Sequence, residues 1–320
     1  NVLVVKEQDT EDGNFPTVKS PNPEDKEGFE IAIKMAKEND VDVIIGTDPD
    51  CDRVGIVVRD ADGIYRTLTG NQTGALLVEY ILSSKKAKGT LPENGVVIKT
   101  IVTTELAAAI AHSYGIEIMN VLTGFKYIGE KMTEFAKTGD HTYLIGFEES
   151  YGYLVGTHAR DKDGVVATML IAEMAAYYKK QGKSLAEVID GLYEEFGYYL
   201  NQTYSFEFGG AAGMQKMADI MTAVRDNTPK SVAGYDVVKV SDYLLKKETE
   251  IATGNTTDID LPKSNVIALH LSDDNAVIIR PSGTEPKIKL YITSVGKDKA
   301  NATEICEKLV AASKEILGIK

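Results

Sequence analysis

The chain has 320 residues, of which 43% are hydrophobic and 26% are charged, so it is expected to fold into two or three globular domains. Its formal net charge of -13 excludes a general nucleic-acid-binding surface, because the phosphate backbone would be repelled. The two cysteines are too few for a disulfide framework and favour a reducing compartment such as the cytoplasm.

The start of the chain carries neither a membrane span nor an export signal. No apolar run approaches the roughly 20 residues that cross a bilayer, and no charged, apolar and small-residue pattern opens the sequence. The first residue is not methionine, and it leads directly into an apolar run. The sequence therefore predicts a piece of a longer protein, with no membrane partner.

The first section predicts a strand, a Pro-rich loop, a helix and a second strand, at residues 2–5, 15–24, 29–37 and 41–46. A third strand is expected over residues 54–58, after an acidic loop. The sequence Asp60-Ala-Asp-Gly63 then predicts a hairpin turn.

Strands and helices alternate in the next section. Helices are expected over residues 73–82, 105–114 and 128–137, and strands over residues 96–101, 117–121 and 142–147. This alternation predicts a parallel sheet with helices on both faces. Two further helices, at residues 165–180 and 185–196, complete the section.

The last section groups its strands, which predicts a separate α+β domain. Strands are expected over residues 199–208, 266–271, 276–279 and 288–293, and helices over residues 213–225 and 298–317. We place the domain boundaries at residues 1–66, 67–196 and 197–320.

The loop Gly46-Thr-Asp48-Pro-Asp50-Cys-Asp52-Arg53 follows an apolar strand and carries the strongest local signal. Three alternate carboxylates suit a hard cation such as Mg²⁺, since each uncompensated pair about 4 Å apart would repel by roughly 4 kcal/mol. A solvated acidic turn is the competing interpretation. A phosphatase nucleophile loop needs Thr or Val where Asp52 stands. An EF-hand needs Gly and Glu where Arg53 and Arg59 stand.

The sequence Arg280-Pro-Ser282-Gly283-Thr284-Glu-Pro-Lys287 lies between two predicted strands. Its guanidinium, hydroxyls and accessible backbone N–H groups predict a phosphate-binding loop. An ordinary Pro-Ser-Gly turn with a surface arginine is the alternative.

Two weaker candidates follow strands as well. The first is Gly146-Phe-Glu148-Glu149-Ser150-Tyr-Gly152, which could bind sugar hydroxyls or be a polar surface loop. The second is Thr123-Gly124-Phe125-Lys126, which could start a helix. Downstream, Lys162 is either a surface charge or a proton-transfer partner. His112 is interpreted as structural, and His158 gains interest only from its polar loop.

Taken together in their order along the chain, the four loops resemble those of the α-D-phosphohexomutase superfamily. The resemblance covers nearly the whole chain, and the phrases Gly-Phe-Glu-Glu-Ser and Ser-Gly-Thr-Glu-Pro-Lys-Ile-Lys are similar to the longer phosphoglucomutases and phosphopentomutases. It implies two α/β domains, the first incomplete, followed by an α+β domain of the TATA-box-binding-protein-like type. It also implies a missing N-terminal domain with a catalytic phosphoserine, whose Ser-His-Asn-Pro motif is not in this sequence.

The resemblance assigns a role to each loop. Asp48, Asp50 and Asp52 would hold Mg²⁺, and Arg53 would stand beside the phosphoserine phosphate, with Lys162 as a second catalytic candidate. The substrate-binding residues would be Thr123, Gly124, Lys126, Glu148, Ser150, Arg160, Arg280, Ser282, Gly283 and Thr284.

The implied reaction interconverts glucose 1-phosphate and glucose 6-phosphate, with glucose 1,6-bisphosphate as intermediate and activator. A phosphopentomutase, a phosphomannomutase or a non-catalytic sugar-phosphate-binding module are the alternatives. In every case the expected partner is a sugar phosphate.

Overall fold

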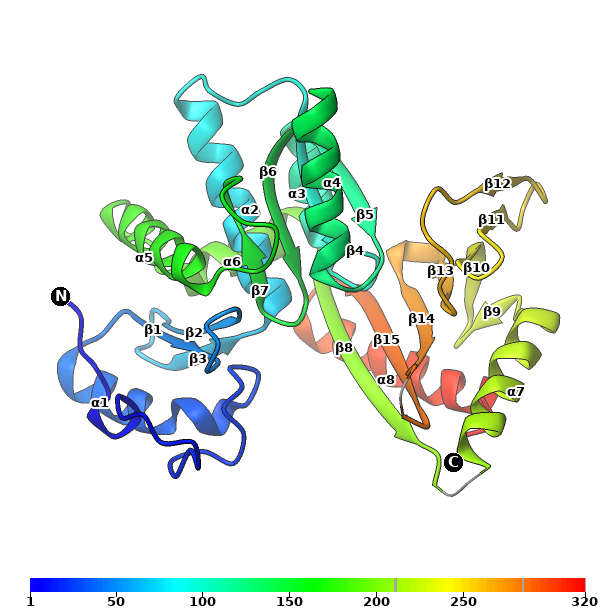
Figure 1. Ribbon diagram of the computed structural model, residues 1–320, viewed down its shortest axis with the longest axis horizontal. Coiled ribbons are helices and arrows are strands. Elements are labelled where there is room, and N and C mark those ends of the chain that lie inside the picture. Colours follow the sequence, from blue (N-terminus) through cyan, green and yellow to red (C-terminus); the bar gives the residue numbers. More distant parts are fainter. Residues whose placement is uncertain (210–211, 284, 320) are drawn as a thin grey trace. The chain divides into compact units, whose positions relative to one another are not determined.

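The computed structural model describes residues 1–209, 212–283 and 285–319, and it divides the chain into two compact units, Asn1–Leu192 and Tyr193–Lys320 (Figure 1). The division falls inside helix α6 (Leu185–Phe196). The predicted boundaries at residues 66 and 196 stay predictions, and each unit is described separately below.

The first unit begins with a small antiparallel sheet of order β1-β2-β3, formed by Val43–Thr47, Val54–Arg59 and Tyr65–Leu68. Helix α1 (Glu30–Asn39) packs on it, because its alanines and the adjacent Phe29 share a core with Ile44 and Val57. Gly63, with φ of 79°, closes the predicted hairpin turn, in which its N–H donates to Asp60 O. The two short 3₁₀ turns are η1 (Lys6–Gln8) and η2 (Lys26–Phe29).

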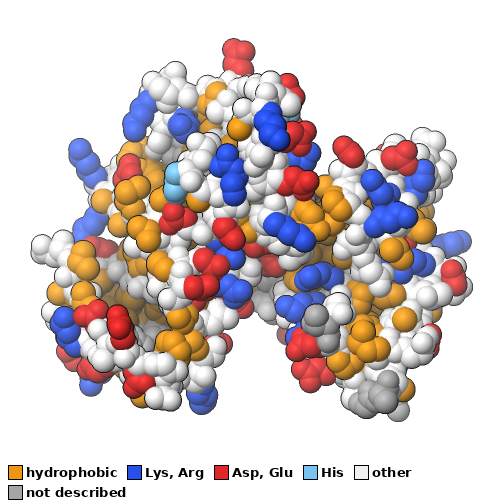
Figure 2. Space-filling view, viewed as in Figure 1, with side chains coloured by type: hydrophobic (Ala, Val, Ile, Leu, Met, Phe, Trp, Pro, Cys, Tyr) orange, Lys and Arg blue, Asp and Glu red, His pale blue; other side chains and the backbone are white. Residues whose placement is uncertain are grey.

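The strand predicted over residues 2–5 is wrong. This segment has no strand hydrogen bonds, and Val2 is 88% exposed. An apolar run becomes a strand only when a neighbouring strand completes its hydrogen-bond ladder, and none of the described strands pairs with it. Val2, Leu3 and Val4 therefore remain exposed, whereas Val5 is half-buried against the core that contains Phe29. Val165 and Met169 are exposed as well, on helix α5 (Gly164–Lys180), in whose region Figure 2 shows hydrophobic side chains on the surface.

The second sheet of this unit is the predicted parallel one. Its order is β5-β4-β6-β7, formed by Glu117–Val121, Gly95–Thr100, Thr142–Glu148 and Gly152–Leu154. Strand β4 is parallel to β5 and to β6, whereas the short β7, which was not predicted, is antiparallel to β6. The loops that follow β4, β5 and β6 therefore lie at one edge of the sheet.

Five helices accompany this sheet: α2 (Gly70–Ala87), α3 (Leu106–Ser113), α4 (Phe125–Thr138), α5 (Gly164–Lys180) and α6. Helix α2 begins with a capping box, because Thr69 and Gln72 bond each other's backbone N–H. Helix α4 places Phe125, Ile128 and Met132 against Val96 and Ile98 of β4. The alternation of strands and helices predicted from the sequence is confirmed in this part of the chain.

The second unit is an antiparallel sheet with helices α7 (Gly213–Asp226) and α8 (Lys299–Ile316). Its strand order is β12-β11-β10-β13-β14-β15-β8, with β9 beside β10. The core joins Met217, Leu290 and Leu309 from both helices and β15. The strands are β8 (Tyr198–Glu207), β9 (Ser231–Val232), β10 (Tyr235–Asp242), β11 (Lys247–Glu250), β12 (Thr256–Asp258), β13 (Ile267–Leu271), β14 (Ala276–Pro281) and β15 (Lys287–Gly296), with a 3₁₀ turn, η3, at Ser272–Asp274.

Two helical glycines give a matched test of the packing in the first unit. A Cβ on Gly74 would lie 2.1 Å from the ring of the buried Phe147, whereas a Cβ on Gly191 would meet nothing within 4 Å. Gly74→Ala should therefore lower the free energy of unfolding by about 1 to 2 kcal/mol, since overpacking outweighs the gain in helix propensity. Gly191→Ala should raise it by about 0.5 to 1 kcal/mol.

Urea unfolding followed by circular dichroism would measure both variants. Equal stabilisation by the two alanines would contradict the close packing of α2 on β6.

Candidate functional site

The three aspartates of the acidic loop lie together between β1 and β2. One carboxylate oxygen from each of Asp48, Asp50 and Asp52 lies within 4.8 Å of the others, and Asp50 is the exposed member. Asp48 and Cys51 shape the loop. Asp48 Oδ1 accepts the N–H groups of Asp52 and Arg53 at 3.0 and 2.9 Å. Cys51 holds a left-handed backbone with φ of 56°. The loop is therefore wound so that its carboxylates converge.

The electrostatics of this loop are only partly balanced. Burial raises the pKa of Asp48 most, the Arg53 N–H opposes this, and the charges of Asp52 and Asp50 raise the pKa further. Lys162 Nζ lies 2.7 Å from Asp52 Oδ2, and Arg53 Nε lies 3.7 Å from Asp48 Oδ2. Burial lowers the pKa of Lys162, but its bond to Asp52 and the surrounding acids outweigh burial and raise it. Three carboxylates whose mutual repulsion is only partly balanced are suited to bind a cation.

Backbone contacts join the acidic loop to the parallel-sheet part of the same unit. Gly164 N donates to Cys51 O at 2.9 Å, and Val54 N donates to Tyr151 O at 2.9 Å. A Cβ on Gly164 would lie 2.5 Å from Cys51 O, so only glycine fits at the start of α5. Sequence reasoning missed Gly164, although its place directly after Lys162 and Asp163 was a usable signal. The contacts bring Lys162 to the acidic loop.

Glu148 ends β6 and lies almost entirely buried, with 6% exposure. Its Oε1 accepts the Gly124 N–H at 2.8 Å, which brings two predicted site loops together. Burial is the largest cause that raises the pKa of Glu148, and the Gly124 N–H opposes it. Gly124 has φ of 121°, a conformation that other residues rarely adopt. The hydroxyl of Thr123 is buried with no hydrogen-bond partner among the described residues.

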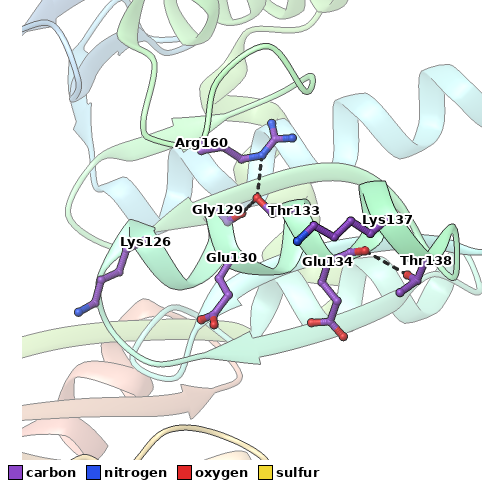
Figure 3. A pocket seen from close by; sticks show the side chains of 8 residues that line it. All are labelled: Lys126, Gly129, Glu130, Thr133, Glu134, Lys137, Thr138 and Arg160. Atoms are coloured by element: carbon purple, nitrogen blue, oxygen red, sulfur yellow. Dashed lines mark hydrogen bonds between the residues drawn. The ribbon is translucent and has the colours of Figure 1, made fainter.

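Lys126 and Arg160 line a groove of about 580 Å³ along α4. Arg160 Nε donates to Thr133 Oγ1 at 3.2 Å, and its Nη1 donates to the carbonyls of Thr157 and Ala159. Figure 3 shows Lys126 at the start of the helix, with its ammonium directed away from Arg160. The structure therefore does not bring these two predicted residues to one point. Two glutamates, Glu130 and Glu134, share the groove with them.

The predicted phosphate-binding loop connects β14 and β15 in the second unit. Arg280 lies opposite Lys289 across the two strands, and its Nη1 donates to Tyr291 Oη at 3.4 Å. Ser282 Oγ accepts the Glu285 N–H at 3.2 Å, and its own N–H donates to Lys287 O at 2.8 Å. Gly283 is exposed. Thr284, the remaining predicted member, lies outside the described residues.

His158 has a partner that the sequence did not reveal. Its Nε2 lies 2.8 Å from Asp163 Oδ2, while Asp163 Oδ1 caps α5 through the Val166 N–H at 2.9 Å. The bond with His158 is the largest cause that lowers the pKa of Asp163. This pair closes the loop that carries Arg160 and Lys162, so a local role for His158 agrees with its geometry.

Three domain models of one family match the chain in order. They are "Phosphoglucomutase/phosphomannomutase, alpha/beta/alpha domain II" over residues 1–63, domain III of the same family over residues 69–196, and its C-terminal domain over residues 238–312. The matched stretches contain the acidic loop, the Glu148 loop and the Arg280 loop, and the domain types agree with the predicted fold class. The chain belongs to the phosphoglucomutase/phosphomannomutase family.

Curated relatives give the same result. A phosphoglucomutase of Staphylococcus saprophyticus is 39% identical over 293 residues, which are 92% of this chain and 52% of that protein. A phosphoglucomutase of Staphylococcus aureus strain MRSA252 is 39% identical over 291 residues, 91% of this chain and 51% of that protein. The chain thus spans about half the length of the curated relatives it matches.

Solved structures share the fold. A putative phosphomannomutase from Thermus thermophilus superposes with a TM-score of 0.61 at 18% identity, covering 95% of this chain and 52% of that one. The open form of parafusin, a phosphoglucomutase from Paramecium, gives 0.63 at 17% identity, covering 93% and 50%.

Membership of this family implies dependence on a metal ion, and the acidic loop offers the carboxylate oxygens that such an ion needs. Within the described parts of the chain, no helix is long and apolar enough to cross a membrane.

The buried carboxyl of Glu148 predicts a pH-dependent stability. The pKa of Glu148 in the folded chain lies above the ordinary value of 4.5. Ionisation of Glu148 at neutral pH therefore destabilises the folded chain relative to the unfolded chain. Glu148→Gln, which keeps an oxygen for the Gly124 N–H, should therefore raise the melting temperature at pH 7. The gain should fade as pH drops through the raised pKa and vanish below about pH 4, where wild-type Glu148 is itself protonated in both states.

Thermal unfolding between pH 3.5 and 7.5 would measure this difference. A gain that is the same at every pH would rule out the charge of Glu148 as its cause.

The acidic loop predicts a magnesium-dependent stability. Mg²⁺ at ten times its dissociation constant should stabilise the wild-type chain by about 1.4 kcal/mol, and Asp50→Asn should remove this effect. Without Mg²⁺, the same variant should melt above wild type, since it removes one of three mutually repelling charges.

Differential scanning calorimetry with and without Mg²⁺ would test both expectations, with Asp62→Asn in the exposed hairpin turn as the charge-matched control. Equal responses of the two variants to Mg²⁺ would contradict a cation site at Asp50.

Proposed function

We propose that the chain is part of a phosphoglucomutase that interconverts glucose 1-phosphate and glucose 6-phosphate. The observation that carries this proposal is the hydrogen-bonded connection between the acidic loop and the part of the chain that holds Glu148 and Lys162, in a chain 39% identical to proteins named phosphoglucomutase. A phosphoryl-transfer site needs a metal and basic groups beside the place where a sugar is held.

In this proposal, Asp48, Asp50 and Asp52 hold Mg²⁺. The ion would stabilise the negative charge of the phosphoryl group during transfer. Arg53 and Lys162 supply the basic groups beside these aspartates, and each lies within 4.0 Å of at least one of the carboxylates. Because Lys162 donates to Asp52, it also fixes the direction of that carboxylate.

Glu148 and Ser150 would contact sugar hydroxyls, while Thr123 and Gly124 would shape the neighbouring wall. A buried carboxylate suits this role because it accepts hydrogen bonds strongly once water is excluded. The unpartnered Thr123 hydroxyl could turn towards a substrate hydroxyl. Lys126 and Arg160 are additional candidates on α4 and the loop before α5.

Arg280, Ser282, Gly283 and Thr284 would bind the phosphate that is not being transferred. Arg280 offers a planar set of donors, and the hydroxyl and backbone N–H groups of the turn add more. The transferred phosphoryl group would come from a phosphoserine in an N-terminal domain of the same protein, with glucose 1,6-bisphosphate as intermediate and activator. The three domains would meet near residues 66 and 196, and the enzyme would act in the cytoplasm.

The test is an assay of glucose 1-phosphate conversion with Mg²⁺ and catalytic glucose 1,6-bisphosphate, using the complete gene product beside the 320-residue chain. Activity is expected only in the complete product, and Asp50→Ala or Arg280→Ala should each reduce kcat/KM at least a hundredfold, since each removes a charged partner of the phosphate or its metal. Mannose 1-phosphate and ribose 1-phosphate, run in parallel, distinguish the alternative mutases.

Activity in the 320-residue chain alone would show that the phosphoserine is not the nucleophile. Binding of sugar phosphates without turnover by either protein would favour a binding module.

A further inference from the structure

The loop at residues 146–152, called the sugar loop below, carries two adjacent glutamates that have different partners. Glu148 bonds the Gly124 N–H, whereas Glu149 Oε2 lies 3.2 Å from Thr100 Oγ1 and 3.1 Å from Thr103 Oγ1 in the turn between β4 and α3. The two threonine hydroxyls are themselves 2.7 Å apart. The two hydroxyl groups have two protons for these three contacts, so only two of the contacts are hydrogen bonds at any moment. In every arrangement, Glu149 accepts at least one of the two hydrogen bonds.

The turn that receives Glu149 is firmly held. Lys99 is completely buried, and its Nζ donates to Thr103 O at 3.0 Å and to Glu105 Oε1 at 2.8 Å. A buried ammonium is costly unless it is paired, so these contacts restrict the turn to one geometry. In addition, Thr104 N donates to Asn71 Oδ1 at 2.9 Å, which ties the turn to the first residues of α2.

The backbone of the sugar loop lies against α2 as well. A Cβ on Gly70 would be 2.2 Å from Glu149 O and 2.8 Å from Tyr151 N. Tyr151 itself has a left-handed backbone, with φ of 68°. Such a conformation in a non-glycine residue persists only where its surroundings hold it in place.

We infer that Glu149 is a positioning residue, which anchors the sugar loop to the β4–α3 turn and so fixes Glu148 on one side and Ser150 on the other. This inference rests on the proposed sugar-phosphate-binding function of that loop. Glu149 acts through its neighbours, because its carboxylate accepts from the hydroxyls of the buried Thr100 and Thr103. A polar surface loop would leave this carboxylate in water.

The experiment compares two substitutions that remove the anchor, Glu149→Ala and Thr103→Val, with two that keep a hydrogen-bonding group, Glu149→Gln and Thr103→Ser. Glu93→Ala, at an exposed position of the same unit, is the charge-matched control. Three quantities are measured on each: hydrogen–deuterium exchange of residues 146–154, affinity for glucose 6-phosphate, and affinity for inorganic phosphate. Circular dichroism verifies folding.

Loss of the anchor should speed exchange in residues 146–154 and weaken glucose 6-phosphate binding about tenfold, the equivalent of one charge-assisted hydrogen bond. Affinity for inorganic phosphate, which would report on the Arg280 loop, should stay unchanged, and the two conservative variants should behave as wild type or nearly so. In the complete gene product, the same loss should raise KM for the sugar phosphate and lower kcat.

Unchanged exchange and affinity in Glu149→Ala would overturn the inference. If wild-type protein binds no glucose 6-phosphate, the proposed function fails instead, and the exchange rates still decide whether Glu149 holds the loop.

Discussion

The contact between Lys162 and Asp52 is the interaction on which the arrangement of the first unit's site depends. It joins a loop of the antiparallel sheet to the segment that precedes helix α5, and it lies beside the backbone bond from Gly164 to Cys51. An ion pair that is largely buried is by itself a weak connection, because the lost hydration of both charges offsets much of their attraction. Here the backbone bonds fix the approach, and the ion pair then directs one carboxylate of the acidic loop.

Charge in this site is arranged at some cost to the fold. Burial works against the ionised forms of both Asp48 and Glu148, and neighbouring carboxylates add to that effect. Residues that are selected only for stability would not keep such groups together. A bound cation and the hydroxyl groups of a sugar would offset this cost, because both interact favourably with ionised carboxylates.

Much of the fold could be predicted because the helical periodicity is strong where one face is buried, as in the helix at residues 185–196. The prediction of a strand at residues 2–5 failed because an apolar run becomes a strand only where a neighbouring strand pairs with it. The strands β7, β9, β11 and β12 were missed because short strands give little periodic signal. The eight-residue β10 was missed as well, and a register shift between Val237 and Lys239 interrupts its alternation of buried and exposed residues. The site loops after β1, β5 and β6 followed from sequence, whereas the partners of Glu149 and Gly164 depend on contacts between residues far apart in the chain. The roles of the individual site residues stay predictions.

Several of these connections are made where glycine leaves room. At Gly70 and Gly164 an added Cβ would collide with backbone atoms of another loop, and at Gly152 with the stem of Lys162. These close contacts depend on the lack of a side chain at each glycine. Over evolutionary time, any replacement of Gly70 or Gly164 would therefore need a compensating shift of a whole loop.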